Sequence, residues 1–187
     1  MEVFVKWPAY LINSSMRLIH WTQKLLKELK ASPVPTPDIL PAKGLGNWYA
    51  NLLRFDRRKC ILFTNEKTIY SFLVPNVIKE ILRDFRLLFL SNLCLNLQFE
   101  GFSQEVIDRV REEYKEIALA KTKDKRVFGF INEFAFEYDF YIRRAGGTAN
   151  MPLMEINKQI NRTPLNASKR GFYPIDILQE MIDPNHG

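Results

Sequence analysis

The sequence predicts an α+β fold: a small antiparallel sheet of about four strands in the N-terminal half, packed against several helices in the C-terminal half. Three observations favour this fold. Short β-branched and aromatic runs separated by turn residues dominate the chain up to about residue 74. Apolar residues at helical spacing dominate from residue 77 onward. Because strands and helices are segregated along the chain, the pattern is typical of α+β proteins.

The first elements are a strand and a helix. Residues 17–21, RLIHW, predict a short strand. The run QKLLKELK predicts a helix over 23–30, with Leu25 and Leu26 on its apolar face. The helix is followed by prolines that predict an extended loop, namely Pro33, Pro35, Pro37 and Pro41.

The central block predicts three consecutive strands over 48–55, 59–65 and 68–74. These runs are apolar, β-branched and aromatic, and the short polar segments between them have hairpin spacing. An antiparallel meander is the simplest arrangement. Apolar residues occur at both odd and even positions of the strands, so we expect helices to cover both faces of the sheet.

The second half predicts two helices before a charged linker. The first carries an apolar stripe that begins at Val77 and runs to about Leu97, and Gly101 ends it. Ser103 is expected to cap the second helix. That helix has an inward face of Val106, Val110, Tyr114 and Ile117. The segment 121–126, KTKDKR, is expected to be the linker.

A third, aromatic helix follows this linker. Its core stripe has a 4-3-4-3 spacing and consists of Val127, Ile131, Phe134, Tyr138 and Tyr141. Two glycines, Gly146 and Gly147, are expected to end it. Two short helices over 154–161 and 174–182 are expected to complete the chain.

The composition excludes several classes of protein. The 187 residues carry a formal net charge of +6, with 26% charged and 13% aromatic residues, which are values of a folded domain. Two cysteines and two histidines do not make a disulfide framework or a zinc site, and no P-loop or Rossmann motif is present. The most apolar stretch, 87–99, is too short and too polar to span a membrane. We therefore expect a cytoplasmic protein with no membrane partner, no metal and no cofactor.

Three segments resemble an uncharacterised prokaryotic domain family, a domain of unknown function. They are TQKLLKEL (22–29), LGNWYANLLRFDRRKCILFTN (45–65) and SFLVP (71–75). The resemblance starts near Met16 and runs to the C-terminus, and it carries no activity, cofactor or catalytic residue to this chain. It implies that residues 1–15 are an upstream extension or a mis-called start, and that 16–187 form a single α+β domain.

The net positive charge is concentrated in one segment of the chain. Residues 17–67 hold ten Lys/Arg and four Asp/Glu, which accounts for the whole +6. Six of these basic residues form a candidate nucleic-acid surface, four around the predicted 55–59 turn and two on the preceding helix: Arg54, Arg57, Arg58, Lys59, Lys24 and Lys27. Such a cluster could neutralise phosphates.

Two interpretations of this basic hairpin remain open. Trp48, Tyr49 and Phe55 lie beside it in the sequence and could provide a stacking platform for bases. Alternatively, the turn is simply solvated, Asp56 serves the turn itself and the aromatic residues belong to the core.

A second candidate surface is the aromatic helix. Phe136 and Phe140 lie one turn apart and fall outside its core stripe. They could make a second buried contact with the sheet, a homodimer or partner interface, or the lip of a pocket.

Acid–base chemistry has weaker support. Glu133 and Glu137 lie four residues apart on the aromatic helix, a pairing that helix surfaces carry routinely. His20 falls within a short strand, and Cys60 and Cys94 lie in apolar runs that raise a thiol pKa and make it inert.

We therefore expect a non-enzymatic binding module that contacts nucleic acid through the basic hairpin. A module that binds itself or another protein through the aromatic helix is the alternative, and an enzyme of unrecognised type is less favoured.

Overall fold

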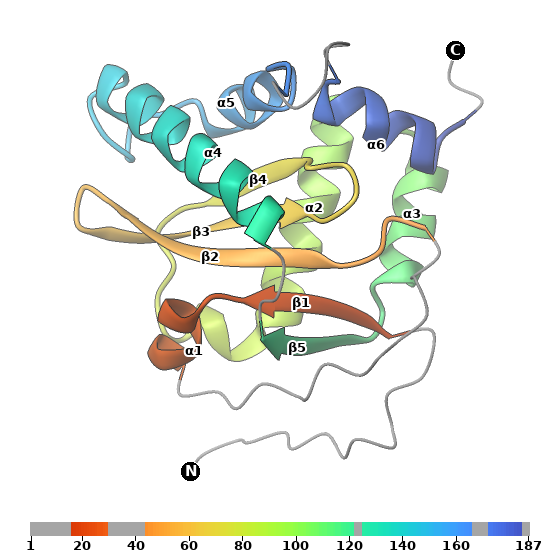
Figure 1. The fold of residues 1–187 in the computed structure, drawn as a ribbon, viewed down its shortest axis with the longest axis horizontal. Coiled ribbons are helices and arrows are strands. Elements are labelled where there is room, and N and C mark those ends of the chain that lie inside the picture. Colours follow the sequence, from red (N-terminus) through yellow and green to blue (C-terminus); the bar gives the residue numbers. More distant parts are fainter. Residues whose placement is uncertain (1–15, 30–43, 122–124, 166–171, 185–187) are drawn as a thin grey trace.

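The computed structural model describes residues 16–29, 44–121, 125–165 and 172–184. In it a five-stranded sheet lies between helices on its two faces, which confirms the α+β fold (Figure 1). The elements in chain order are β1 (Arg17–Trp21), α1 (Gln23–Leu29), β2 (Trp48–Phe55), β3 (Arg58–Asn65), β4 (Ser71–Val74), η2 (Ile81–Asp84), α2 (Phe85–Glu100), α3 (Gln104–Glu113), β5 (Ile117–Lys121), α4 (Lys125–Arg144), α5 (Leu153–Ile160) and α6 (Pro174–Ile182). The expected extension at 1–15 and the predicted proline loop lie outside the described residues.

The sheet has more strands than predicted and is mixed. Its order is β4-β3-β2-β1-β5, so it has five strands rather than about four and is not antiparallel throughout. β2, β3 and β4 do form the predicted antiparallel meander. β1 instead runs parallel to β2, with Ile19 opposite Trp48, and parallel to β5, with Arg17 opposite Ile117. Parallel neighbours need a crossover connection, and the chain between β1 and β2 includes α1.

The fifth strand, β5, occupies residues predicted to end a helix and begin a linker. Its sequence IALAK contains alanine and lysine, which favour helices, so local propensity points away from a strand. Pairing with β1 along five residues decides its conformation, and Ala118 and Ala120 are buried there. This is a case of tertiary pairing overriding propensity.

Several helix boundaries lie at their predicted signals, but α3 ends at Glu113, before the predicted Tyr114 and Ile117. Ser103 caps α3 by accepting a hydrogen bond from the Val106 N–H, and Gly101 ends α2 in the left-handed conformation, at φ 97°. The predicted helix start near Val77 is wrong: α2 begins at Phe85 after the short 3₁₀ turn η2. Asp84 caps it by accepting from the Leu87 N–H at 2.9 Å.

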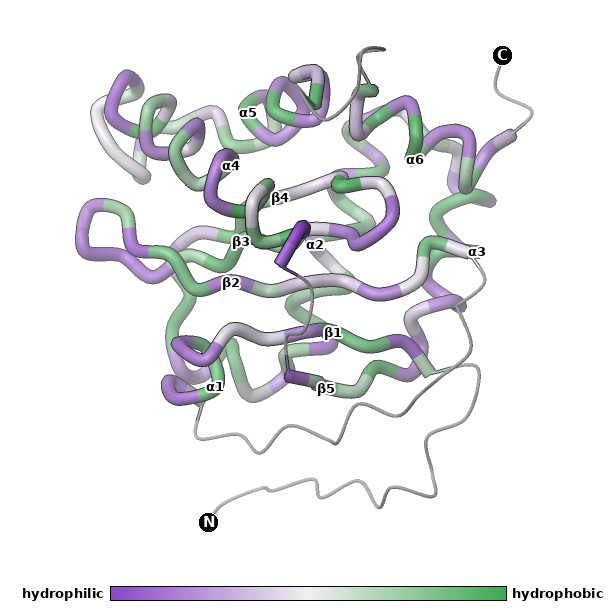
Figure 2. The backbone as a smooth tube through the Cα atoms, in the orientation of Figure 1, coloured by the Kyte–Doolittle hydropathy of each residue, from purple (hydrophilic) through white to green (hydrophobic). Residues whose placement is uncertain are grey.

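Each face of the sheet has its own apolar core, as predicted. One core packs α1, α2, α3 and α6 against one face, and the other packs α4 and α5 against the opposite face. Figure 2 shows hydrophobic residues along the strands and a largely hydrophilic tip on the β2–β3 hairpin.

None of the described helices has the length and apolar character needed to cross a membrane.

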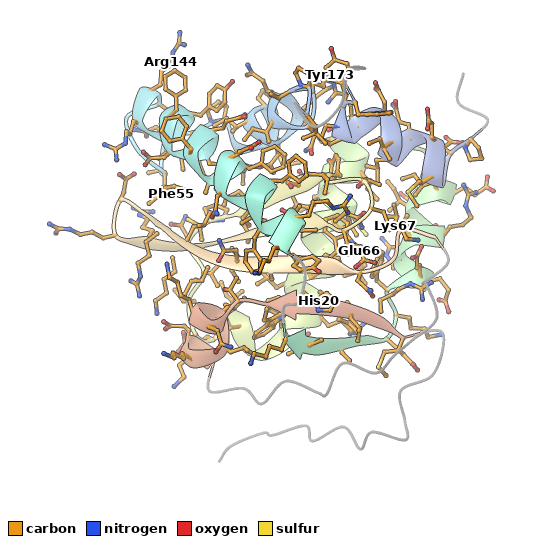
Figure 3. The ribbon with its side chains drawn as sticks, viewed as in Figure 1. His20, Phe55, Glu66, Lys67, Arg144 and Tyr173 are labelled. Carbon is orange, nitrogen blue, oxygen red and sulfur yellow. The ribbon has the colours of Figure 1, made fainter. Side chains whose placement is uncertain are left out.

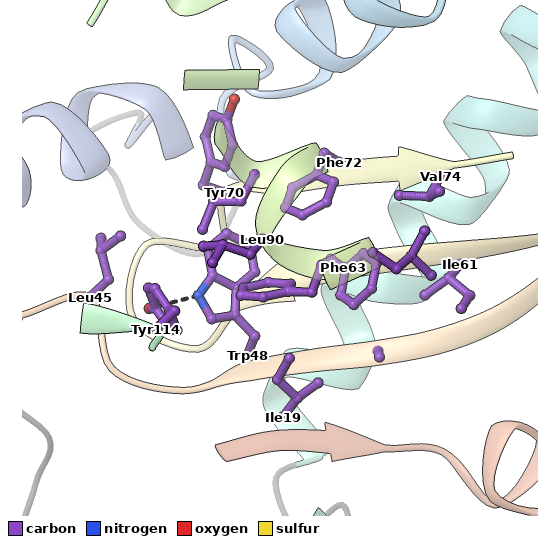
Figure 4. Packing of buried hydrophobic residues seen from close by; sticks show 14 of the residues in the cluster. Ile19, Leu45, Trp48, Ile61, Phe63, Tyr70, Phe72, Val74, Leu90 and Tyr114 are labelled. Carbon is purple, nitrogen blue, oxygen red and sulfur yellow. Dashed lines mark hydrogen bonds between the residues drawn. The ribbon is translucent and has the colours of Figure 1, made fainter. Parts of the chain in front are cut away.

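Trp48 lies at the centre of the larger core (Figure 4). Its ring packs edge-on against Phe72 and Phe89, with centroids 5.5 and 5.3 Å away. Its indole N–H donates to the Tyr114 hydroxyl at 2.7 Å, and that hydroxyl donates to the Gly46 carbonyl at 2.8 Å. A buried polar chain therefore joins the start of β2 to the end of α3.

The outer edge of β4 is covered by asparagines rather than by another strand. Asn161, at the end of α5, hydrogen-bonds Ser71, and the side-chain Oδ1 of Asn157 accepts from the Leu73 N–H at 3.2 Å. Four helical residues rise about 6 Å, close to the roughly 6.7 Å between alternate residues of a strand. The two asparagines can therefore reach the Ser71 N–H and C=O and the Leu73 N–H in register, which covers this part of the sheet edge.

Candidate nucleic-acid interface

The basic hairpin is a tight two-residue turn. Phe55 pairs with Arg58, so Asp56 and Arg57 alone connect β2 to β3. Both have positive φ, 47° and 64°, as a type I′ turn requires. Aspartate adopts this conformation with modest cost, whereas glycine is the usual residue at the second position. Arg57 therefore holds a strained backbone at the tip of the hairpin.

Asp56 does more than form the turn. Its carboxylate accepts a hydrogen bond from the Thr148 N–H at 2.8 Å, across a separation of 92 residues. Gly147, at φ 117°, allows this approach, since a Cβ there would lie 3.0 Å from the Asp56 carboxylate. The hairpin is thus attached to the turn between α4 and α5, and the Asp56 charge is engaged.

Glu28 connects the hairpin to α1. Its carboxylate pairs with the Lys59 ammonium and lies 3.9 Å from the Arg54 guanidinium. The hydrogen bond from Lys59 is the main reason that the Glu28 pKa is lowered; burial opposes this shift. The ion pairs bring together residues of α1 and the hairpin that the sequence had grouped only by charge.

The other basic residues of the cluster are exposed. Lys24 and Lys27 extend from α1, and Arg57 from the turn. The Arg54 side chain is 61% exposed, and Arg58 donates to the Asn76 side chain at 3.0 Å. All five of these side chains are exposed, and the Phe55 label in Figure 3 marks the hairpin end of the sheet.

Arg143 joins this cluster from α4. With Asp56, Arg58 and the Gly146–Gly147 turn, it lines a shallow open hollow of about 420 Å³. A hydrogen bond to Asp139 raises the pKa of its guanidinium. Nothing in the sequence places Arg143 beside the hairpin, because only the packing of α4 on the sheet brings them together. We name the seven residues Lys24, Lys27, Arg54, Arg57, Arg58, Lys59 and Arg143 the hairpin-end surface.

The aromatic residues beside the hairpin do not form a stacking platform. Trp48 has no exposed surface, and Tyr49 and Phe55 are 4% and 7% exposed. The second interpretation of these rings, that they belong to the core, is confirmed. Any nucleic acid bound here would contact charged side chains and not aromatic faces.

The aromatic helix α4 leaves part of its surface uncovered. Phe134 and Tyr138 of the predicted stripe are buried, whereas Tyr141 is only half-buried. Phe136 and Phe140 are 78% and 55% exposed, so the hypothesis that they make a second contact with the sheet is wrong. The outer end of the helix at Arg144 is visible at the top of Figure 3.

The remaining titratable candidates do not assemble into one site. Burial raises the pKa of Glu137, and the charge of the exposed Glu133 raises it further. His20 is buried on β1, and its Nδ1 lies 3.2 Å from the Lys121 carbonyl oxygen. Burial raises the pKa of the Cys60 and Cys94 thiols, as predicted. Within the described ranges, no group of three or more His, Cys, Asp or Glu side chains could hold a metal ion.

The fold and its surfaces define a small α+β domain with a mixed sheet, a basic hairpin at one end and an exposed aromatic pair on α4. The chain belongs to the DUF6933 family, a domain of unknown function, whose family model matches residues 18–177. This match confirms the resemblance to an uncharacterised domain family. A search of the curated proteins finds no match.

Proposed function

We propose that this chain is a cytoplasmic, non-enzymatic binding module that contacts the phosphate backbone of double-stranded nucleic acid through the hairpin-end surface. The observation that carries the proposal is the convergence of basic side chains from α1, β2, β3, the connecting turn and α4 at one end of the sheet. Two free cysteines suit a reducing compartment.

The hairpin-end surface keeps a net positive charge when its acidic residues are counted. Glu28 pairs with Lys59 and Arg54, Asp56 accepts from the Thr148 N–H, and Asp139 pairs with Arg143 at 2.7 Å. Seven basic side chains against three engaged carboxylates leave an excess of four positive charges. Phosphate neutralisation of this kind supplies most non-specific affinity for nucleic acid.

Two features favour a duplex over a single strand. Binding of single strands depends on exposed aromatic rings, and the rings beside the hairpin are buried. A two-stranded β-ribbon fits the major groove of a duplex. The hairpin protrudes beyond the helices in Figure 1, with Arg57 at its tip.

The arginine at position 57 gives a second line of support. The backbone there has a φ of 64°, which glycine would adopt without strain. A charged residue that costs stability at a protruding tip is consistent with a contact made outside the molecule.

Fluorescence anisotropy with short labelled duplex DNA, duplex RNA and single strands over a salt series tests the proposal. The double variant R57E/R58E should bind duplex about tenfold more weakly and lower the salt slope by about two. The control R111E/K115E makes the same change in net charge on α3 and just before β5, at the opposite end of the sheet. Equal losses in both variants, or no binding by the native chain at low salt, would overturn the proposal.

A further inference from the structure

One side of α4 is not covered by any other described element. Glu133, Phe136, Phe140 and Arg143 follow one another at intervals of three, four and three residues, on the side of the helix opposite the buried Tyr138. Phe136, at 78%, is the most exposed large apolar side chain in the described part of the chain. We name these four residues the α4 stripe.

The spacing of the stripe is that of a helix–helix seam. Intervals of three and four residues are those of the a and d positions that face a partner helix in a coiled coil. Gly129 lies on the same line one turn earlier, and a Cβ built there meets no atom within 4 Å. The seam is therefore open from Gly129 to Arg143, about four turns of the helix.

The stripe is complementary to itself when two copies run antiparallel. About a two-fold axis level with Tyr138, Phe136 faces Phe140 of a second copy. Glu133 then faces Arg143 of the second copy, and the same contacts occur again on the other side of the axis. A parallel arrangement would instead place Glu133 against Glu133 and Arg143 against Arg143.

The charged ends of the stripe are available for such a contact. Glu133 is exposed, and the Arg143 side chain is 77% exposed while Asp139 holds it at 2.7 Å. Apolar residues in the middle and opposite charges at the ends are the arrangement by which helix pairs select partner and orientation.

We propose that a second copy of this chain docks on the α4 stripe and forms an antiparallel, two-fold symmetric α4–α4 dimer. Arg143 belongs to both the hairpin-end surface and the α4 stripe, so the dimer is tested in the absence of nucleic acid. A single helix pair is smaller than a standard interface of roughly 1,600 Å², so the dimer is expected to dissociate on dilution.

Sedimentation equilibrium over a range of protein concentrations, without nucleic acid, tests the dimer. The native chain should approach twice its mass of 22.0 kDa as concentration rises. E133R and R143E should each weaken association by about fivefold or more, because each places like charges together at both ends. The double swap E133R/R143E should restore association, and an equimolar mixture of the two single variants should form a heterodimer.

Matched controls separate the seam from overall charge. E105R and R111E make the same charge changes on the exposed face of α3 and should leave association unchanged. F136S/F140S should abolish the dimer without loss of helical circular dichroism, because both rings are exposed. A native chain that stays monomeric at millimolar concentration, or a double swap that fails to restore association, would overturn the inference.

Discussion

Asn161 and Ser71, 90 residues apart, exchange two hydrogen bonds of 2.7 Å. The Asn161 side-chain carbonyl accepts from the Ser71 N–H, and its amide donates to the Ser71 C=O. The side chain thus takes the place of a sixth strand beside β4. Both residues are fully buried, so water cannot substitute for these bonds.

Removing this side chain should destabilise the fold. Asn161→Ala leaves the buried Ser71 N–H and C=O without partners, and we expect a loss of about 2–4 kcal/mol in the free energy of unfolding. Urea denaturation measures it. Asn132→Ala, on the exposed face of α4, is the control and should change stability by less than about 0.5 kcal/mol. Similar losses in both variants would contradict the strand-replacement role.

Replacing Arg57 should separate stability from binding. Arg57→Gly relieves the strain of a non-glycine residue at φ 64°, and we expect a gain of about 0.5–1 kcal/mol in unfolding free energy together with weaker duplex binding. Arg54→Gly removes an equal charge from a regular strand position and should lose both stability and affinity. A destabilised Arg57→Gly protein would mean that the arginine makes favourable contacts within the fold.

Neutralising Glu28 should strengthen nucleic-acid binding. Glu28→Gln releases Lys59 and Arg54 from their shared partner, so duplex affinity should rise several-fold at low salt. Anisotropy measures the affinity, and Glu112→Gln, which removes the same charge next to Lys115, should have little effect. Unchanged binding in Glu28→Gln would show that Lys59 and Arg54 do not contact the ligand.

The same variant should have a defined pH signature. The folded pKa of Glu28 is lowered, so the stability that its ion pair contributes is present above the ordinary value of 4.5 and is lost as pH falls through the folded pKa. Glu28→Gln should therefore be less stable than the native chain at neutral pH, and the two should converge in acid. Thermal unfolding followed by circular dichroism at several pH values measures the difference.

Glu137 should show the opposite pH dependence. Burial, and then the charge of Glu133, raises its folded pKa, while a hydrogen bond with Thr163 works the other way. The native chain should lose stability as pH rises from the ordinary value of 4.5 through this raised pKa. Glu137→Gln should be the more stable protein near neutral pH and equal in stability below 4.5. Glu133→Gln removes only the repulsion and should give a smaller gain, and no gain in Glu137→Gln would contradict the burial effect.

Local chemistry was enough to predict the meander and most helix ends. The runs over 48–74 are rich in β-branched and aromatic residues and are separated by short polar turns, as in strands of a meander. Gly101 and Ser103 mark helix boundaries by the conformations and hydrogen bonds they favour. The basic hairpin was predictable for the same reason, since its residues are neighbours in the chain.

Contacts between distant segments decided the rest. β5 is a strand because β1 pairs with it, although its composition favours a helix. Arg143 lies beside the hairpin because α4 packs across the sheet, and Phe136 stays exposed because the opposite side of that helix is already buried.

The sequence by itself determined the class of fold, the positions of most elements and the location of the net positive charge, because periodicity, turn chemistry and charge are properties of neighbouring residues. Only the tertiary structure decided the direction of β1, the burial of Trp48 and the hydrogen bonds from Asn161 to the outer edge of β4. Each of these depends on which surfaces meet when segments far apart in the chain exclude water together.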